Sequence, residues 1–190
     1  MPPFSQFRAA PNLLTLLRLM SIPFLVINIL DGHYRTAVTL FLLAGVSDAL
    51  DGLLARMLQQ RTVVGQYLDP IADKLLLSTL FLVLMHEGLI PRYVTILVFS
   101  RDLGILLIAT LLFATGALRT FPPTAFGKLN TLLQVVTITG IMLSLLFPAA
   151  WLHHTTSILL RVIAVCVTVS AMEYGWLILR RLNAPAPKPA

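Results

Sequence analysis

The sequence predicts an all-α integral membrane protein with six transmembrane helices, and its composition, run lengths and periodicity all favour this class. Of the 190 residues, 57% are hydrophobic and only 12% are charged, whereas about a quarter of a soluble domain is charged. The apolar residues gather in runs of near-membrane length, and these runs lack the period-two alternation of barrel strands. Too little polar surface remains to cover a water-facing globule, so a lipid bilayer is the expected solvent.

Six apolar runs follow one another, separated by short polar, proline or glycine breaks. A helix of about 20 residues is long enough to cross a hydrocarbon core of ~30 Å. The expected spans are residues 12–30, 36–58, 66–87, 92–115, 126–147 and 156–180. The breaks between them fall at Asp31-Gly32, around Arg61, at Gly88 to Pro91, at Pro122-Pro123 and at Pro148. We expect one transmembrane domain, residues 1–183, and a disordered tail, residues 184–190.

The first run is expected to be a span and not a cleaved signal peptide. Its apolar stretch is too long, it contains Arg18, and it lacks a clear small-residue cleavage site. Asn12 follows Pro11 and is expected to cap the helix. In the third run, Pro70 is expected in or near the first helical turn, where its missing N–H costs least.

The basic residues predict which way the chain crosses the membrane. With six spans, one side holds both termini and the second and fourth loops, and it carries Arg8, Arg56, Arg61, Arg119, Lys128, Arg180, Arg181 and Lys188. The other side carries only Arg35 and Arg92. Because positive residues stay on the inside, both termini are expected to be cytoplasmic, or matrix-facing in a mitochondrial inner membrane.

The net charge of +6 at pH 7 predicts an interaction with anionic lipid and not with nucleic acid. The charges lie at span ends, and they do not form a stripe with interleaved stacking aromatics.

Four aspartates lie at the cytoplasmic ends of the second and third expected spans. Asp48 and Asp51 lie three residues apart on one face of a helix, together with Gly52, Ala55 and Arg56. Gly65, Asp69 and Asp73 share one face of the following helix. Because the link is short, the two helices are expected to be antiparallel neighbours. Two carboxylates from each helix can then converge.

Four converging carboxylates need a cation, because an aspartate at the centre of a membrane helix costs roughly 2.5–3.5 kcal/mol. An all-oxygen ligand set without nearby His or Cys favours Mg²⁺ or Mn²⁺ over zinc. Such ions bind diphosphates, which makes a nucleotide diphosphate the natural ligand. A structural ion pair or the proton relay of a small ion carrier is the alternative for these acids. A calcium loop is excluded, because Leu50, Leu53 and Leu54 belong to an apolar helix.

These residues resemble the signature of the CDP-alcohol phosphatidyltransferase family at every fixed position. The match runs Asp48-x-x-Asp51-Gly52-x-x-Ala55-Arg56, eight residues, Gly65, three residues, Asp69, three residues, Asp73. The resemblance implies six transmembrane helices, a polar metal-containing cavity open to the cytoplasmic side, homodimers, and transfer of a phosphatidyl group from CDP-diacylglycerol to an alcohol. It implies that Asp48, Asp51 and Asp69 bind metal and the CDP diphosphate.

The resemblance also assigns roles to the remaining site residues. Asp73 would bind metal and act as the general base. Nucleotide binding is expected at Asp48, Gly52, Ala55, Arg56, Gly65 and, at the chain start, Asn12. The glycines and the alanine would leave room for the ligand between the helices, and Arg56 can pair with phosphate or with a carboxylate.

The acceptor is predicted from segments outside the signature. Leu89 to Pro91, Ser100 to Asp102 and Lys128 to Thr131 resemble the eukaryotic-type cardiolipin synthases of the family, which implies phosphatidylglycerol as acceptor. The phosphatidylglycerophosphate synthases, which use glycerol 3-phosphate, are the alternative. Arg101 lies well inside the fourth span, where a charge is costliest, and it could instead pair with another helix. We expect the acceptor's anionic group to be bound by Arg101, Lys128 and Arg119.

Overall fold

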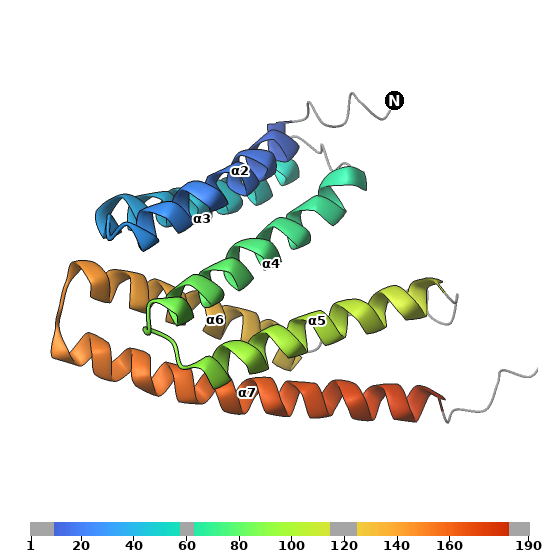
Figure 1. Cartoon of the computed structure of the whole chain (residues 1–190). Coiled ribbons are helices and arrows are strands. Elements are labelled where there is room, and N and C mark those ends of the chain that lie inside the picture. Colours follow the sequence, from blue (N-terminus) through green and yellow to red (C-terminus); the bar gives the residue numbers. More distant parts are fainter. Residues whose placement is uncertain (1–9, 58–62, 115–124, 183–190) are drawn as a thin grey trace, which may run out of the picture. The chain divides into compact units, whose positions relative to one another are not determined.

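The computed structural model describes residues 10–57, 63–114 and 125–182 (Figure 1). Side chains within the helices are described for residues 13–48, 71–105, 107, 127–173, 175 and 176. The described chain forms six α-helices: α2 (Ala10–Leu30), α3 (Tyr34–Met57), α4 (Val63–His86), α5 (Arg92–Ala114), α6 (Ala125–Leu146) and α7 (Ala150–Leu182). The prediction of an all-α chain is confirmed, and each helix covers one of the six predicted runs.

Glycines end α2 and α4 at the predicted breaks. Gly32 and Gly88 have φ angles of 72° and 73°, a left-handed conformation that glycine adopts at little cost. After α2, the N–H of His33 donates to the carbonyl of Asn28 at 2.8 Å, and after α4 the N–H of Leu89 donates to that of Leu84 at 2.9 Å. These 6→1 bonds satisfy carbonyls that the helix end leaves open, and they turn the chain back sharply.

Two helices begin three or more residues earlier than the sequence predicts. Helix α4 begins at Val63 and not at residue 66, which places Pro70 in the interior of the helix and corrects its predicted position in the first turn. Helix α7 begins at Ala150 and not near residue 156. The carbonyl of Ala149 accepts from the N–H groups of Leu152 and His153, so the helix starts directly after Pro148, which cannot donate a backbone hydrogen bond.

Within the described chain, three helices contain stretches long and apolar enough to cross a membrane. These stretches are Leu13–Leu30 in α2, Gly127–Leu146 in α6 and Ala150–Glu173 in α7. Trp151 and Trp176 are 70% and 61% exposed and lie about 37 Å apart along α7. Exposed tryptophans near both ends of an apolar helix are typical of the two interfaces of a bilayer.

Helix α2 presents a continuous apolar face. Its exposed large hydrophobic side chains recur at the helical repeat and are Leu13, Leu17, Met20, Phe24 and Ile27. In water such a face is unfavourable, but lipid tails solvate it well. The opposite side of the helix buries Leu25 and Ile29 completely, so the same helix has an apolar lipid side and an apolar core side.

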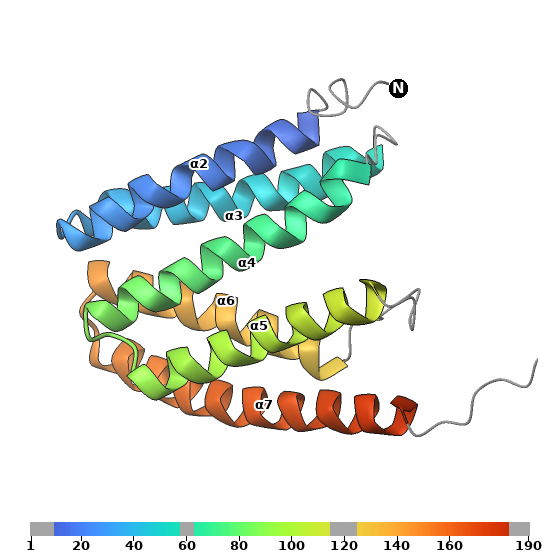
Figure 2. The same ribbon diagram turned by 45° about the vertical axis from the view of Figure 1, so that its right-hand side comes forward.

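The chain divides into two compact units, each described by itself. The first comprises residues 1–90 with 138–153, and the second comprises residues 91–137 with 154–190. In the first unit, α2 packs against both α3 and α4 (Figure 2). In the second unit, α5 is joined to α7 by a side-chain hydrogen bond described below. The predicted single domain over residues 1–183 stays a prediction, and the predicted tail, residues 184–190, lies outside the described residues.

Candidate active site

The predicted signature lies on two consecutive helices. Asp48 lies on α3, and Asp73 lies on α4. The remaining signature residues and Asn12 have described helical backbones but side chains outside the described set: Asn12, Asp51, Gly52, Ala55, Arg56, Gly65 and Asp69. The prediction that Asn12 caps the helix is wrong, because α2 begins at Ala10 and Asn12 lies inside its first turn. Because α3 and α4 are unbroken through these positions, the predicted helical spacing holds for the backbone, with Asp51 one turn from Asp48 and Asp69 one turn from Asp73.

Asp48 and Asp73 lie at similar distances from the residues that link α3 to α4. Asp48 lies nine residues before the end of α3 at Met57, and Asp73 lies ten residues after the start of α4 at Val63. At 1.5 Å per residue, both lie about 15 Å along their helices from the linking residues. Helices joined by a short link run antiparallel, so the two carboxylates reach the same level of the bundle.

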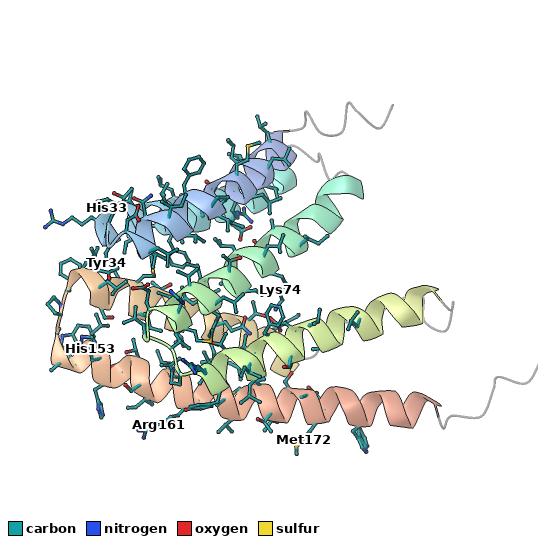
Figure 3. The ribbon with its side chains drawn as sticks, viewed as in Figure 1. His33, Tyr34, Lys74, His153, Arg161 and Met172 are labelled. Atoms are coloured by element: carbon teal, nitrogen blue, oxygen red, sulfur yellow. The ribbon has the colours of Figure 1, made fainter. Side chains whose placement is uncertain are left out.

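Arg18 of α2 joins these two carboxylates. Its Nη1 lies 2.9 Å from Asp48 Oδ1 and 2.6 Å from Asp73 Oδ1. One guanidinium nitrogen therefore contacts α3 and α4 at once. Lys74, which follows Asp73 on α4, is labelled in Figure 3. One acid from each helix therefore lies at the same guanidinium nitrogen, and the predicted convergence of all four acids stays a prediction.

The three groups differ sharply in exposure. The side chain of Arg18 is 1% exposed, whereas those of Asp48 and Asp73 are 51% and 44% exposed. The cation therefore lies on the inner side, and the carboxylates face outward. Arginine stays protonated in proteins, so a permanent positive charge supports two acids that remain accessible to a ligand.

The described acids fit a hard divalent cation. Carboxylate oxygens are the ligands that Mg²⁺ and Mn²⁺ prefer. Since distances of 2.9 and 2.6 Å meet at one nitrogen, the two oxygens lie no more than about 5.5 Å apart. No group of three or more His, Cys, Asp or Glu residues gathers among the side chains that the structure describes, and Asp51 and Asp69 lie outside that set.

Sequence reasoning missed the role of Arg18 in this site. A charge inside an apolar span is a signal in itself, because such a residue needs a partner inside the protein. Its partners are 30 and 55 positions away along the chain, however, and no helical periodicity connects them. The signal therefore identified the residue without identifying the contact.

Arg101, predicted to bind the acceptor, lies in the second unit and is buried. Its Nη1 donates to Asp102 Oδ1 at 2.7 Å, and its Nη2 donates to Ser170 Oγ of α7 at 3.0 Å. The bond to Ser170 is the contact with another helix that the structural alternative predicts, and the acceptor role of Arg101 stays a prediction. Lys128 lies exposed near the start of α6, and Arg119 lies outside the described residues.

Helix α6 carries a buried polar face. Asn130, Gln134 and Thr137 recur at the helical repeat, and each is 0% exposed. Within the described chain, their side-chain polar atoms lack hydrogen-bond partners. Sequence reasoning used Asn130 only as part of the resemblance carried by Lys128 to Thr131. A polar residue in an apolar helix gives no sign of whether it faces the core.

Comparison with known proteins identifies the family. Residues 8–178 match the sequence model of the CDP-alcohol phosphatidyltransferases. A cardiolipin synthase (CMP-forming) of Rattus norvegicus is 31% identical over 188 residues, which cover 87% of this chain and 59% of that protein. The human protein of the same name is 30% identical and is covered over 60% of its length.

A second kind of relative matches equally well. The CDP-diacylglycerol–glycerol-3-phosphate 3-phosphatidyltransferase of Aquifex aeolicus is 31% identical over 166 residues, which cover 86% of this chain and 92% of that protein. The chain thus spans about three-fifths of the rat and human relatives but nearly the whole of the bacterial one.

Proposed function

Because the chain belongs to the CDP-alcohol phosphatidyltransferase family, we propose that it transfers a phosphatidyl group from CDP-diacylglycerol to an alcohol and releases CMP. The observation that carries this proposal is the pair of outward-facing carboxylates, Asp48 and Asp73, held by Arg18 at two positions of the family signature. An ion carrier that uses the same acids would not release CMP, so CMP formation separates the two functions.

Asp48, Asp51, Asp69 and Asp73 would together hold Mg²⁺ or Mn²⁺. When bound, such an ion would neutralise charge on the diphosphate and stabilise CMP as the leaving group. Asp51 and Asp69 each lie one helical turn from a carboxylate that Arg18 contacts, on the side of the linking residues. This spacing supports one shared site for all four acids.

Asp73 would act as the general base. Its carboxylate would take the proton of the acceptor hydroxyl, whose oxygen attacks the lipid-linked phosphorus in line with the departing CMP oxygen. A new phosphorus–oxygen bond forms while the diphosphate bridge breaks, and CMP carries away the electron pair. The contact with Arg18 fixes Asp73 on one side and leaves the carboxylate partly exposed for this step.

The nucleotide would lie beside the same helices. Gly52, Ala55 and Gly65 are small, and they would allow the ligand to approach the backbone. Arg56 would pair with phosphate. Asn12, at the start of α2, would contact the nucleotide.

For the acceptor, we propose phosphatidylglycerol, which gives cardiolipin. The rat and human relatives carry that name, and the basic residues offered for the acceptor are few: Arg101, Arg119 and Lys128. These few basic residues suit an acceptor with a single phosphate charge. A lipid acceptor is such a molecule, and its acyl tails anchor it in the membrane. Glycerol 3-phosphate is the second candidate, favoured by the name and the coverage of the Aquifex relative.

An acceptor competition tests this choice. Purified protein in bilayers receives CDP-diacylglycerol and Mg²⁺ with phosphatidylglycerol, glycerol 3-phosphate, inositol phosphate and serine together, and the lipid product is identified. Cardiolipin as the main product supports the first acceptor. Phosphatidylglycerophosphate without cardiolipin would replace it by the second, and absence of CMP under all conditions would refute the transferase itself.

The active protein would be a homodimer. In the membrane, all six helices of each chain would span the bilayer, with both termini on the cytoplasmic or matrix side. The excess of basic residues on one side supports this orientation. A cysteine introduced at Gln59 should react with an impermeant reagent only from the cytoplasmic side, and one at His33, exposed between α2 and α3 (Figure 3), only from the other. The opposite pattern would overturn the orientation.

A further inference from the structure

The contact of Arg18 with two acids of the signature has an unusual geometry. One guanidinium nitrogen is shared between Asp48 on α3 and Asp73 on α4. An ordinary surface ion pair joins two exposed groups and contributes little to stability. Here the cation is almost completely buried, whereas both acids are about half exposed. Arg18 is therefore a fixed inner charge, and the acids provide the face that a ligand can reach.

Electrostatics explains why such a charge is needed. Two carboxylates whose oxygens lie within about 5.5 Å repel each other, and the repulsion is stronger away from bulk water. Asp51 and Asp69, one turn away on the same helices, add to the negative charge. A positive group that contacts both Asp48 and Asp73 offsets part of this repulsion even when no metal ion is bound.

We propose that Arg18 is a positioning residue that pairs Asp48 with Asp73 before a divalent cation binds and remains behind them as their inner counter-charge. This inference rests on the proposed function, because it concerns the acids assigned there to metal. Arg18 would act through the carboxylates without touching the reacting atoms.

The proposal predicts that the effect of Arg18 on the stability of the protein depends on whether a divalent cation is bound. If Arg18 offsets the repulsion of the acids, its loss should matter most when no other cation is present. A divalent ion bound to the same acids should then restore much of the lost stability. If Arg18 were only a structural link between helices, metal would not compensate for its loss.

The test compares thermal unfolding of the full chain in detergent micelles in EDTA and in excess Mn²⁺, without nucleotide or lipid substrate. Arg18→Gln keeps a long polar side chain but removes the charge. In EDTA its unfolding midpoint should fall by about 4–8 °C, and Mn²⁺ should recover most of that loss. The metal-induced rise should therefore exceed that of the wild type.

Arg101→Gln is the matched control. Arg101 is also buried and bonded, but its partners Asp102 and Ser170 lie outside the signature. Its midpoint should fall by the same amount in EDTA and in Mn²⁺. The role of Arg18 is refuted if Arg18→Gln behaves like this control, or if its midpoint does not fall in EDTA.

A second variant keeps the test decisive if Arg18→Gln does not fold. Arg18→Lys retains the charge on a shorter side chain, so its ammonium should reach the two acids less closely than Arg18 Nη1 does. Its metal-induced rise should lie above that of the wild type, and an equal rise would refute the proposal.

Mn²⁺ binding to the wild type, measured by electron paramagnetic resonance, reports separately on the proposed metal site. Absence of binding there would refute the proposed metal function, whereas normal binding with equal rises would refute only the role of Arg18.

Discussion

Replacement of Asp73 by asparagine separates the chemical role of this carboxylate from its role in packing. Asparagine has the same shape and keeps an oxygen that can accept from Arg18, but it cannot take a proton. If Asp73 is the general base, the transfer rate should fall by roughly 10²–10⁴-fold, which corresponds to about 2.7–5.4 kcal/mol in the activation barrier.

The expected effect on stability is smaller. The substitution turns a charge-assisted bond of 2.6 Å into a neutral one, and charge-assisted bonds are about twice as strong as neutral ones. Because the Asp73 side chain is 44% exposed, solvent screening reduces the difference to about 1 kcal/mol. For a chain of this length, that shifts the unfolding midpoint by only about 2–4 °C.

Two measurements on the same preparation distinguish these effects. Single-turnover CMP release in bilayers reports the chemical step, and thermal unfolding reports the folded state. Asp31→Asn, at an exposed position between α2 and α3, is the matched control and should change neither. A folded Asp73→Asn protein that transfers at nearly the wild-type rate would refute the assignment of the general base.

Other predictions concern the metal, the second unit and helix α6. EDTA should abolish turnover and Mg²⁺ or Mn²⁺ should restore it, so full activity in metal-free buffer would exclude a metal mechanism. Ser170→Ala should lower the free energy of unfolding by about 1.5–3 kcal/mol, because it removes a buried bond to the Arg101 guanidinium. In contrast, Thr168→Ala should have little effect, because its exposed hydroxyl donates to the carbonyl of Ala164 within its own helix. Gln134→Met should raise the unfolding midpoint, since it removes a buried amide that lacks a hydrogen-bond partner in the described chain, and a lowered midpoint would contradict this reading.

Much of the local structure could be predicted from the sequence. The long apolar runs determine the helices, because a backbone in lipid must satisfy its own hydrogen bonds and a helix does so within one segment. Glycines at positions 32 and 88 end two of them, because only glycine adopts the left-handed conformation there at little cost. The starts of α4 and α7 were placed several residues too late. Gly65 follows the first two residues of α4, and His153, His154 and Thr155 interrupt the apolar residues at the start of α7, so both starts resemble a loop.

The spacing of the four signature acids could also be predicted, since residues three and four apart lie on one face of any α-helix. The short link predicts that α3 and α4 are antiparallel neighbours, and this stays a prediction, whereas α2 packs against both of them. The spacing of the acids depends on local helix geometry alone. The family signature contains the same spacing.

Only the tertiary structure assigned Arg18 to Asp48 and Asp73, and only it placed the polar side chains of α6 inside. In a soluble protein the polar side of a helix faces water, so the sequence pattern reveals the direction of the core. In a membrane helix, both the lipid side and the core side are apolar, as the two faces of α2 illustrate. The sequence by itself therefore determined which segments are helices and which residues share a helix. Which face turns inward, and which distant charges meet there, was decided by the packing of one helix against another.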